Sequence, residues 1–117
     1  MRLLRRATTL LMATSVQAST PAYDVIVYGA SGFTGRLAVE YLTDRYATSG
    51  LKWAIAGRSR ERLEALKAAV PIIVADATDA ASVDAMVAQT KVLLNYAGSP
   101  YITKAFPVVE ACARHGT

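Results

Sequence analysis

Residues 23–38 read YDVIVYGASGFTGRLA, a short apolar stretch that leads into a glycine-rich turn. The pattern of residues 23–28 predicts a β-strand. Gly29, Gly32 and Gly35 then follow with two residues between neighbours, and helical spacing of apolar residues begins after them. A strand, a glycine loop and a helix in this order are typical of the first unit of a dinucleotide-binding α/β fold.

Each glycine of this loop has its own predicted role. Gly29 lets the chain turn sharply off the strand, Gly32 lets backbone N–H groups approach a pyrophosphate, and Gly35 lets the helix pack close to the sheet. The helix N-terminus favours an anion, with the hydroxyls of Ser31 and Thr34 as extra donors. Glycines that only form a turn are the alternative. The loop residues predicted to bind the nucleotide are Gly29, Ala30, Ser31, Gly32, Phe33, Thr34 and Gly35.

Three further apolar runs predict strands, at residues 52–56 (KWAIA), 72–75 (IIVA) and 92–95 (VLLN). Nearly continuous apolar runs fit strands that are buried on both faces, as parallel sheets require. Right-handed crossovers place the strands in the order 3-2-1-4. The predicted fold class is therefore α/β, a Rossmann-type doubly wound parallel sheet of about four strands, ending where a fifth strand would begin.

Apolar side chains at helical spacing predict the helices that connect these strands. Ser59 and Asp79 suit N-caps, and Pro107 and Gly116 suit the first turn and the end of the last helix. The predicted inward-facing stripes are Leu37, Ala38, Tyr41 and Leu42; Leu63, Leu66 and Val70; Val83, Met86 and Val87; and Val108, Val109 and Cys112.

The end of the second predicted strand favours NADP over NAD as the cofactor. Arg58 stands where a NAD-specific fold carries an acid for the ribose 2′-hydroxyl. A guanidinium can bind a 2′-phosphate through paired N–H donors, so Arg58, with Ser59 beside it, predicts NADP (NADPH). A solvated surface arginine is the alternative.

Two other strand ends contribute candidate site residues. Asp76 either accepts a hydrogen bond from the adenine amino group or caps the following turn. Asn95, Ala97 and Gly98 are expected near the nicotinamide ribose, because ligands bind beyond the carboxyl ends of strands where the strand order reverses. Asn95 either orders this loop or stabilises a local turn.

The net charge of +4 is concentrated near the N-terminus. Residues 1–22 contain three arginines and no acid, which leaves 10 basic and 9 acidic groups for the rest, or +1. Nucleic-acid binding is therefore not expected. Residues 1–22 are predicted to be a targeting segment, mitochondrial or secretory, or a disordered extension. Residues 23–117 are predicted to form an NAD(P)-binding domain that is incomplete at its C-terminus.

No catalytic residue is predicted. Tyr101 and Lys104 are three positions apart, whereas a short-chain dehydrogenase needs a spacing of four on a helix. Cys112 belongs to an inward stripe, and His115 is the only histidine. The single cysteine excludes an internal disulfide, and without partners at ligand spacing it predicts no metal site.

Four segments together resemble the N-terminal domain of the saccharopine dehydrogenase-like oxidoreductases, a family that includes trans-acting enoyl reductases. They are YDVIVYGASGFTGRLA (23–38), LKWAIAGRSRERLEAL (51–66), ADATD (75–79) and VVEACARHGT (108–117). The resemblance implies an NADP-linked oxidoreductase, with homologues in lipid and glycolipid metabolism at lipid droplets, mitochondria or membranes. A cytoplasmic location follows if residues 1–22 are not a presequence. The positions that match the family's nucleotide residues and strand ends are Gly29, Gly32, Gly35, Arg58, Asp76 and Asn95.

Two main functions are open at this point. The chain is either the NADP-binding part of an oxidoreductase, inactive alone, or a non-catalytic NADP-sensing module. In the first case a full-length form takes a small-molecule or lipid-like substrate, and a homo-oligomer is left open. A non-functional remnant with an exposed strand edge is a third alternative.

Overall fold

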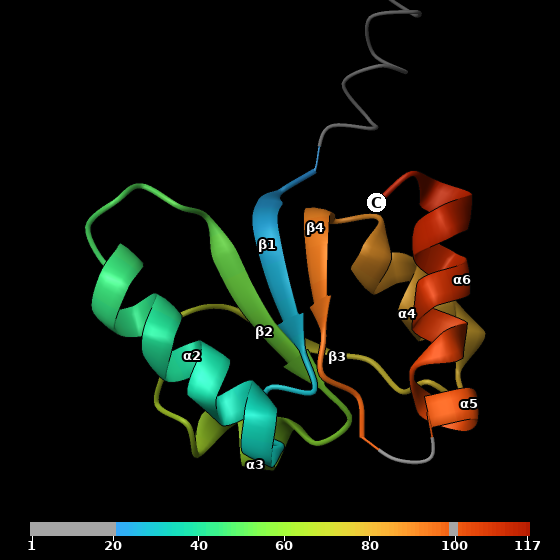
Figure 1. The fold of residues 1–117 in the computed structure, drawn as a ribbon, viewed down its shortest axis with the longest axis horizontal. Helices are drawn as coiled ribbons and strands as arrows, with labels where there is room; N and C mark the ends of the chain where they lie inside the picture. The colour runs from blue at the N-terminus through green and yellow to red at the C-terminus, as the bar shows by residue number, and fades with distance from the viewer. Residues whose placement is uncertain (1–20, 99–100) are drawn as a thin grey trace, which may run out of the picture.

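The computed structural model describes residues 21–98 and 101–117. Strands and helices alternate along this part of the chain (Figure 1). The elements are β1 (Tyr23–Tyr28), α2 (Phe33–Tyr46), β2 (Trp53–Gly57), α3 (Arg60–Glu64), β3 (Ile72–Val74), α4 (Ala80–Val87), β4 (Thr90–Asn95), α5 (Tyr101–Lys104) and α6 (Phe106–His115). Nearly all of the predicted targeting segment lies outside the described residues.

The four strands of the described chain form one parallel sheet in the order β3-β2-β1-β4. The predicted fold class and strand order are confirmed. β2 begins at Trp53 and is buried along its whole length, because it lies between two strands and between two layers of helices. β1 has the predicted bounds, and the ends of the other three strands differ from the predicted ones by at most two residues.

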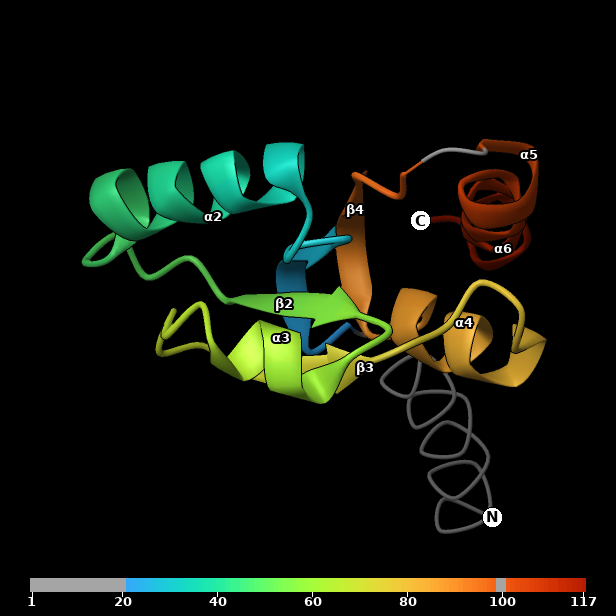
Figure 2. The same ribbon diagram turned by 90° about the horizontal axis from the view of Figure 1, so that it is seen from below.

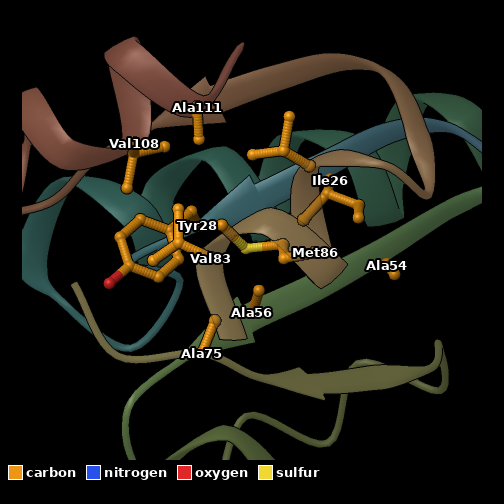
Figure 3. Close-up of a cluster of buried hydrophobic side chains, with 10 residues drawn as sticks. Ile26, Tyr28, Ala54, Ala56, Ala75, Val83, Met86, Val108 and Ala111 are labelled. Atoms are coloured by element: carbon orange, nitrogen blue, oxygen red, sulfur yellow. The ribbon is translucent and has the colours of Figure 1, made fainter. Parts of the chain in front are cut away.

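Two helical layers cover the two faces of the sheet (Figure 2). Successive residues of β1 point to opposite faces, so Val27 packs toward α2 and α3, whereas Ile26 and Tyr28 pack toward α4 and α6. Figure 3 shows the second of these clusters, with Met86 of α4 among the side chains of β1 and β2. Burial of a side chain such as Met86 contributes about 1.5–3 kcal/mol to folding.

The inward-facing stripe predicted for α2 is wrong at two positions. Leu37 and Tyr41 are 54% and 52% exposed. The buried residues of α2 are instead Gly35, Val39 and Leu42. Gly35 carries no side chain and therefore comes nearest to the sheet, and the i+4 and i+7 positions lie on the same face of a helix. Leu37 and Tyr41 consequently lie on the opposite side.

The other predicted helices are confirmed in part. α3 ends at Glu64, so Leu66 and Val70 of its predicted stripe lie beyond the helix, where they are partly buried against the core. Val83, Met86 and Val87 are fully buried on α4. On α6, however, Val109 is 53% exposed, and Val108 and Ala111 are the buried residues. The prediction missed Ala111 because its methyl group gives a weak hydrophobic signal.

The helix ends test the predicted caps. Ser59 caps α3, since its Oγ accepts a hydrogen bond from the Arg62 N–H at 3.3 Å. Gly116 ends α6 in the left-handed conformation, as predicted. Asp79 stands at the N-cap of α4, but its side chain makes no capping hydrogen bond.

Candidate functional site

A cleft of about 430 Å³ lies at the carboxyl ends of the strands. In Figure 1 the arrowheads of β1, β2 and β4 all point to this edge of the sheet. The cleft is lined by Tyr28, Gly29, Ser31, Gly32, Phe33, Thr34, Gly57, Arg58, Ser59, Arg62, Asp76, Ala77, Thr78, Tyr96, Ala97, Gly98, Thr103 and Lys104. The structure therefore brings together residues from all four loops in which site residues were predicted.

The turn after β1 is held by close backbone contacts. Gly29 has φ +77°, and a Cβ added there would lie 2.6 Å from the Tyr96 carbonyl oxygen. A Cβ added at Gly35 would overlap the Gly29 carbonyl oxygen. The Gly29 N–H donates to the Ala56 carbonyl at 2.9 Å, which joins the turn to β2. The predicted sharp turn and close helix packing are thus both present.

The N-terminus of α2 faces the cleft and can receive an anion. Gly32 is the N-cap of α2 and makes no side-chain capping bond. The first turn of a helix has N–H groups without an intrahelical partner, and the helix dipole makes this end positive. No acidic residue stands in this turn, and Phe33 and Thr34 line the cleft beside Gly32. A phosphate group fits this end of the helix.

Two of the predicted loop residues do not line the cleft. Ala30 is fully buried in the core between the sheet, α2 and α3. Gly35 is buried where α2 meets the loop. Both residues therefore support the shape of the loop from the core side and do not face the cleft.

Arg58, Ser59 and Arg62 form the β2–α3 side of the cleft. Within the described residues neither arginine forms a salt bridge, whereas Arg60 of the same helix lies 4.0 Å from Glu64. Arg62 was not predicted. Identifying which arginine of the RSRER run faces the cleft requires knowing that α3 begins at Arg60 and is capped by Ser59.

Asp76 caps the turn after β3, one of its two predicted roles. Its Oδ1 accepts hydrogen bonds from the N–H and the Oγ1–H of Thr78, both at 2.9 Å. These bonds, with a smaller effect of the nearby Arg58 charge, lower the pKa of Asp76 below its ordinary value. Beside it, burial raises the pKa of Tyr28, and the Asp76 charge adds to that effect. Asp76 also lines the cleft.

Asn95 orders the loop after β4. Its Oδ1 accepts from the Ala97 N–H at 3.2 Å, and its Nδ2 donates to the Ala105 carbonyl at 3.1 Å. Asn95 does not line the cleft, but Ala97 and Gly98 do. Its side chain therefore connects the cleft loop to the start of α6.

The sequence pattern of the saccharopine dehydrogenase NADP-binding domain matches residues 25–117. The chain belongs to this family. NADP is accordingly the cofactor of this domain. The glycine turn, the exposed N-terminus of α2 and Arg58, which forms no salt bridge among the described residues, fit such a cofactor, because their N–H groups are donors that suit its phosphates.

Proteins of other organisms have sequences similar to this chain. A trans-acting enoyl reductase of Mycobacterium leprae is 40% identical over 81% of this chain and 24% of its own length. A saccharopine dehydrogenase-like oxidoreductase of Bos taurus is 39% identical over 81% of this chain and 26% of its own. A lipid droplet localized protein of Caenorhabditis elegans is 41% identical over 80% of this chain and 24% of its own length. The chain thus spans about a quarter of the length of these relatives.

Solved structures share the fold of this NADP-binding domain. Triphenylmethane reductase of Citrobacter sp., complexed with NADP(H), superposes with a TM-score of 0.69 at 24% identity over 80% of this chain and 34% of that one. An NADPH-dependent quinone oxidoreductase of Escherichia coli gives 0.63 at 24% identity, over 80% and 34%. These similarities show the fold alone.

Three side chains with chemistry-bearing groups near the end of the chain differ in their position relative to the cleft. Lys104 lines the cleft, from a short helix, α5, that was not predicted. Cys112 is half-buried against the α4–α6 core, where burial raises the pKa of its thiol. The Nε2 atom of His115 lies 3.2 Å from Asp84 Oδ1, outside the cleft. In the described ranges, no helix is long and apolar enough to cross a membrane, and no three metal-ligating side chains cluster.

Proposed function

We propose that NADP binds across the carboxyl ends of β1, β2 and β4, with each part of the cofactor at a different loop. The glycine loop holds the pyrophosphate through the N-terminus of α2, and the hydroxyls of Ser31 and Thr34 add donors. Arg58 and Ser59 hold the 2′-phosphate. Asp76 lies on the adenine side, and Ala97 and Gly98 lie on the nicotinamide side.

One observation carries this proposal. The N-terminus of α2, which has no side-chain cap, and the guanidinium of Arg58, which forms no salt bridge among the described residues, line the same cleft, although they come from different βα units. A molecule with phosphates at two separate positions satisfies both groups. A dinucleotide without the 2′-phosphate would leave Arg58 without its strongest partner.

The proposal extends to hydride transfer in a longer protein. When bound, the nicotinamide supplies the hydride, and the protein's part is to bind, orient and exclude water. The names of the mycobacterial and nematode relatives favour a lipid-like substrate. We propose that this chain alone binds NADPH without oxidising it. In the presence of a short enoyl thioester, the absorbance of NADPH is expected to fall no faster with the purified chain than without it. Steady oxidation of NADPH by the purified chain would overturn the proposal that the chain alone is inactive.

Isothermal titration calorimetry of the full chain with NADPH and NADH tests cofactor binding. NADPH is expected to bind more tightly, and Arg58→Gln is expected to remove most of that preference, with a loss of about 1.5–3 kcal/mol toward NADPH alone. Arg60→Gln is the matched control, since Arg60 lies two positions away and does not line the cleft. Equal affinities of the unsubstituted chain for NADPH and NADH would contradict the proposed role of Arg58.

A further inference from the structure

We propose that Arg62 is a second ligand of the 2′-phosphate, so that Arg58, the Ser59 hydroxyl and Arg62 act together as a clamp. This inference rests on the proposed binding of NADP in the cleft. It assigns the preference for NADP over NAD to three side chains of the β2–α3 connection. All three line the cleft.

The geometry of α3 directs Arg62 toward the cleft. Its backbone N–H donates to Ser59 Oγ at 3.3 Å, which fixes Arg62 as the third residue of the helix. Helical side chains lean toward the N-terminus of their helix, so the Arg62 guanidinium extends back over the cap. The next residue, Leu63, is fully buried, with Cδ2 3.4 Å from the position of a Cβ on Gly57. Leu63 therefore fixes the rotation of α3 about its axis.

The charges around this end of the cleft are unbalanced. Of the arginines in the RSRER run, Arg60 lies beside Glu64, whereas Arg58 and Arg62 have no salt bridge among the described residues. Asp76 is the acid in the cleft lining, and its Oδ1 already accepts two hydrogen bonds from Thr78. Two like charges that face the same space repel each other, and a phosphate dianion between them removes that repulsion.

Ser59 completes a set of donors. Its Oγ accepts from the Arg62 N–H, so the hydroxyl hydrogen remains for a ligand. A guanidinium has five N–H donors and no acceptor. The three side chains can therefore all donate hydrogen bonds to one group. The oxygens of a 2′-phosphate accept several such bonds, whereas the 2′-hydroxyl of NAD is a much weaker partner.

Calorimetry with four probes separates the 2′-phosphate from the rest of the cofactor. The probes are NADPH, NADH, adenosine 2′,5′-bisphosphate and adenosine 5′-phosphate, each titrated into the full chain at one ionic strength. Arg62→Gln is expected to weaken NADPH and the bisphosphate about tenfold, the loss of about one charge-assisted hydrogen bond. The same variant leaves NADH and the monophosphate unchanged. Arg60→Gln, the matched control, leaves all four unchanged.

Each other outcome overturns a definite statement. If the unsubstituted chain binds neither NADPH nor the bisphosphate, the proposed function fails and the clamp with it. If that chain prefers NADPH and Arg62→Gln keeps the same preference, the clamp alone fails. Equal weakening of all four probes would show a general charge effect and would also overturn the clamp. Arg62→Gln keeps the backbone N–H that Ser59 caps, and circular dichroism of the variant checks that it folds.

Discussion

The cleft and the outer surface of α4 and α6 differ in how tightly the backbone is packed and in whether the charged side chains form salt bridges. At the cleft the backbone is tightly packed around Gly29 and Gly35, while the arginines that line it have no salt bridge among the described residues. At the α4–α6 surface Asp84 pairs with Arg114 at 2.9 Å, and Gly116 has open space around it. The difference indicates that the cleft residues are arranged for a ligand, whereas the charges between α4 and α6 are arranged for each other.

The largest expected effect comes from Gly35→Ala. The added methyl group would overlap the Gly29 carbonyl oxygen. Its other near neighbours are also backbone atoms, of Gly29 and Ala30, which cannot move aside as a flexible side chain would. We expect a loss of about 3 kcal/mol in the free energy of unfolding and loss of NADPH binding. Urea denaturation measures the first and calorimetry the second. Gly98→Ala is the control for the stability measurement only, because a Cβ there meets no atom of the described residues within 4 Å; similar losses of stability for the two variants would contradict the tight cleft backbone.

A second pair of variants isolates the contact between the turn and the loop after β4. Gly29 and Gly50 have nearly the same φ, +77° and +82°, but a Cβ clashes with Tyr96 only at Gly29. Gly50→Ala is expected to cost about 1 kcal/mol from its conformation alone, and Gly29→Ala a further ~1–3 kcal/mol from the clash. Denaturation curves of the two variants would coincide if the contact had no importance.

Asn95→Ala tests whether a side chain behind the cleft orders its loop. The change removes the hydrogen bonds to Ala97 and Ala105, at a cost of about 1–2 kcal/mol in stability, and it weakens NADPH binding through the loop. Gln89→Ala is the control, because it removes an exposed bond of 2.9 Å to the Ala85 carbonyl, outside the cleft. If Asn95→Ala binds NADPH as tightly as the unsubstituted chain, the order of this loop has no part in cofactor binding.

The smallest effect is expected at the paired charges of the α4–α6 surface. The hydrogen bond from Arg114, and to a lesser degree that from His115, lowers the pKa of Asp84 below its ordinary 3.8. A carboxylate whose folded-state pKa is lowered stabilises the fold above its ordinary pKa and loses this effect as the pH falls through the lowered value. Asp84→Asn should therefore reduce the melting temperature slightly at pH 7 and not at pH 2. An equal reduction at both values would exclude an ionic origin, and NADPH binding should not change.

The sheet and the glycine loop were predictable because each depends on local patterns. Alternation of apolar runs with helical stripes gives the strand order once crossovers are right-handed. The roles of Gly29 and Gly35 follow from their spacing after a strand. Arg58 lies next to a strand end, so its place on the cleft also followed from the sequence.

The parts that were missed depend on rotation about helix axes and on contacts distant in sequence. The exposure of Leu37 and Tyr41 follows from the close approach of Gly35 to the loop, which hydrophobic spacing does not reveal. Arg62 reaches the cleft only because Ser59 fixes the start of α3. Lys104 reaches it through α5, a single short turn with no periodic signal.

The most direct test of the proposed NADP site is a map of NADPH binding by NMR on the full chain, which at 12.5 kDa suits this method. The account predicts that amide shifts on titration concentrate at residues 29–34, 57–62, 76–78 and 96–98. Shifts that instead concentrate on the α4–α6 surface, or no shifts at millimolar NADPH, would contradict it.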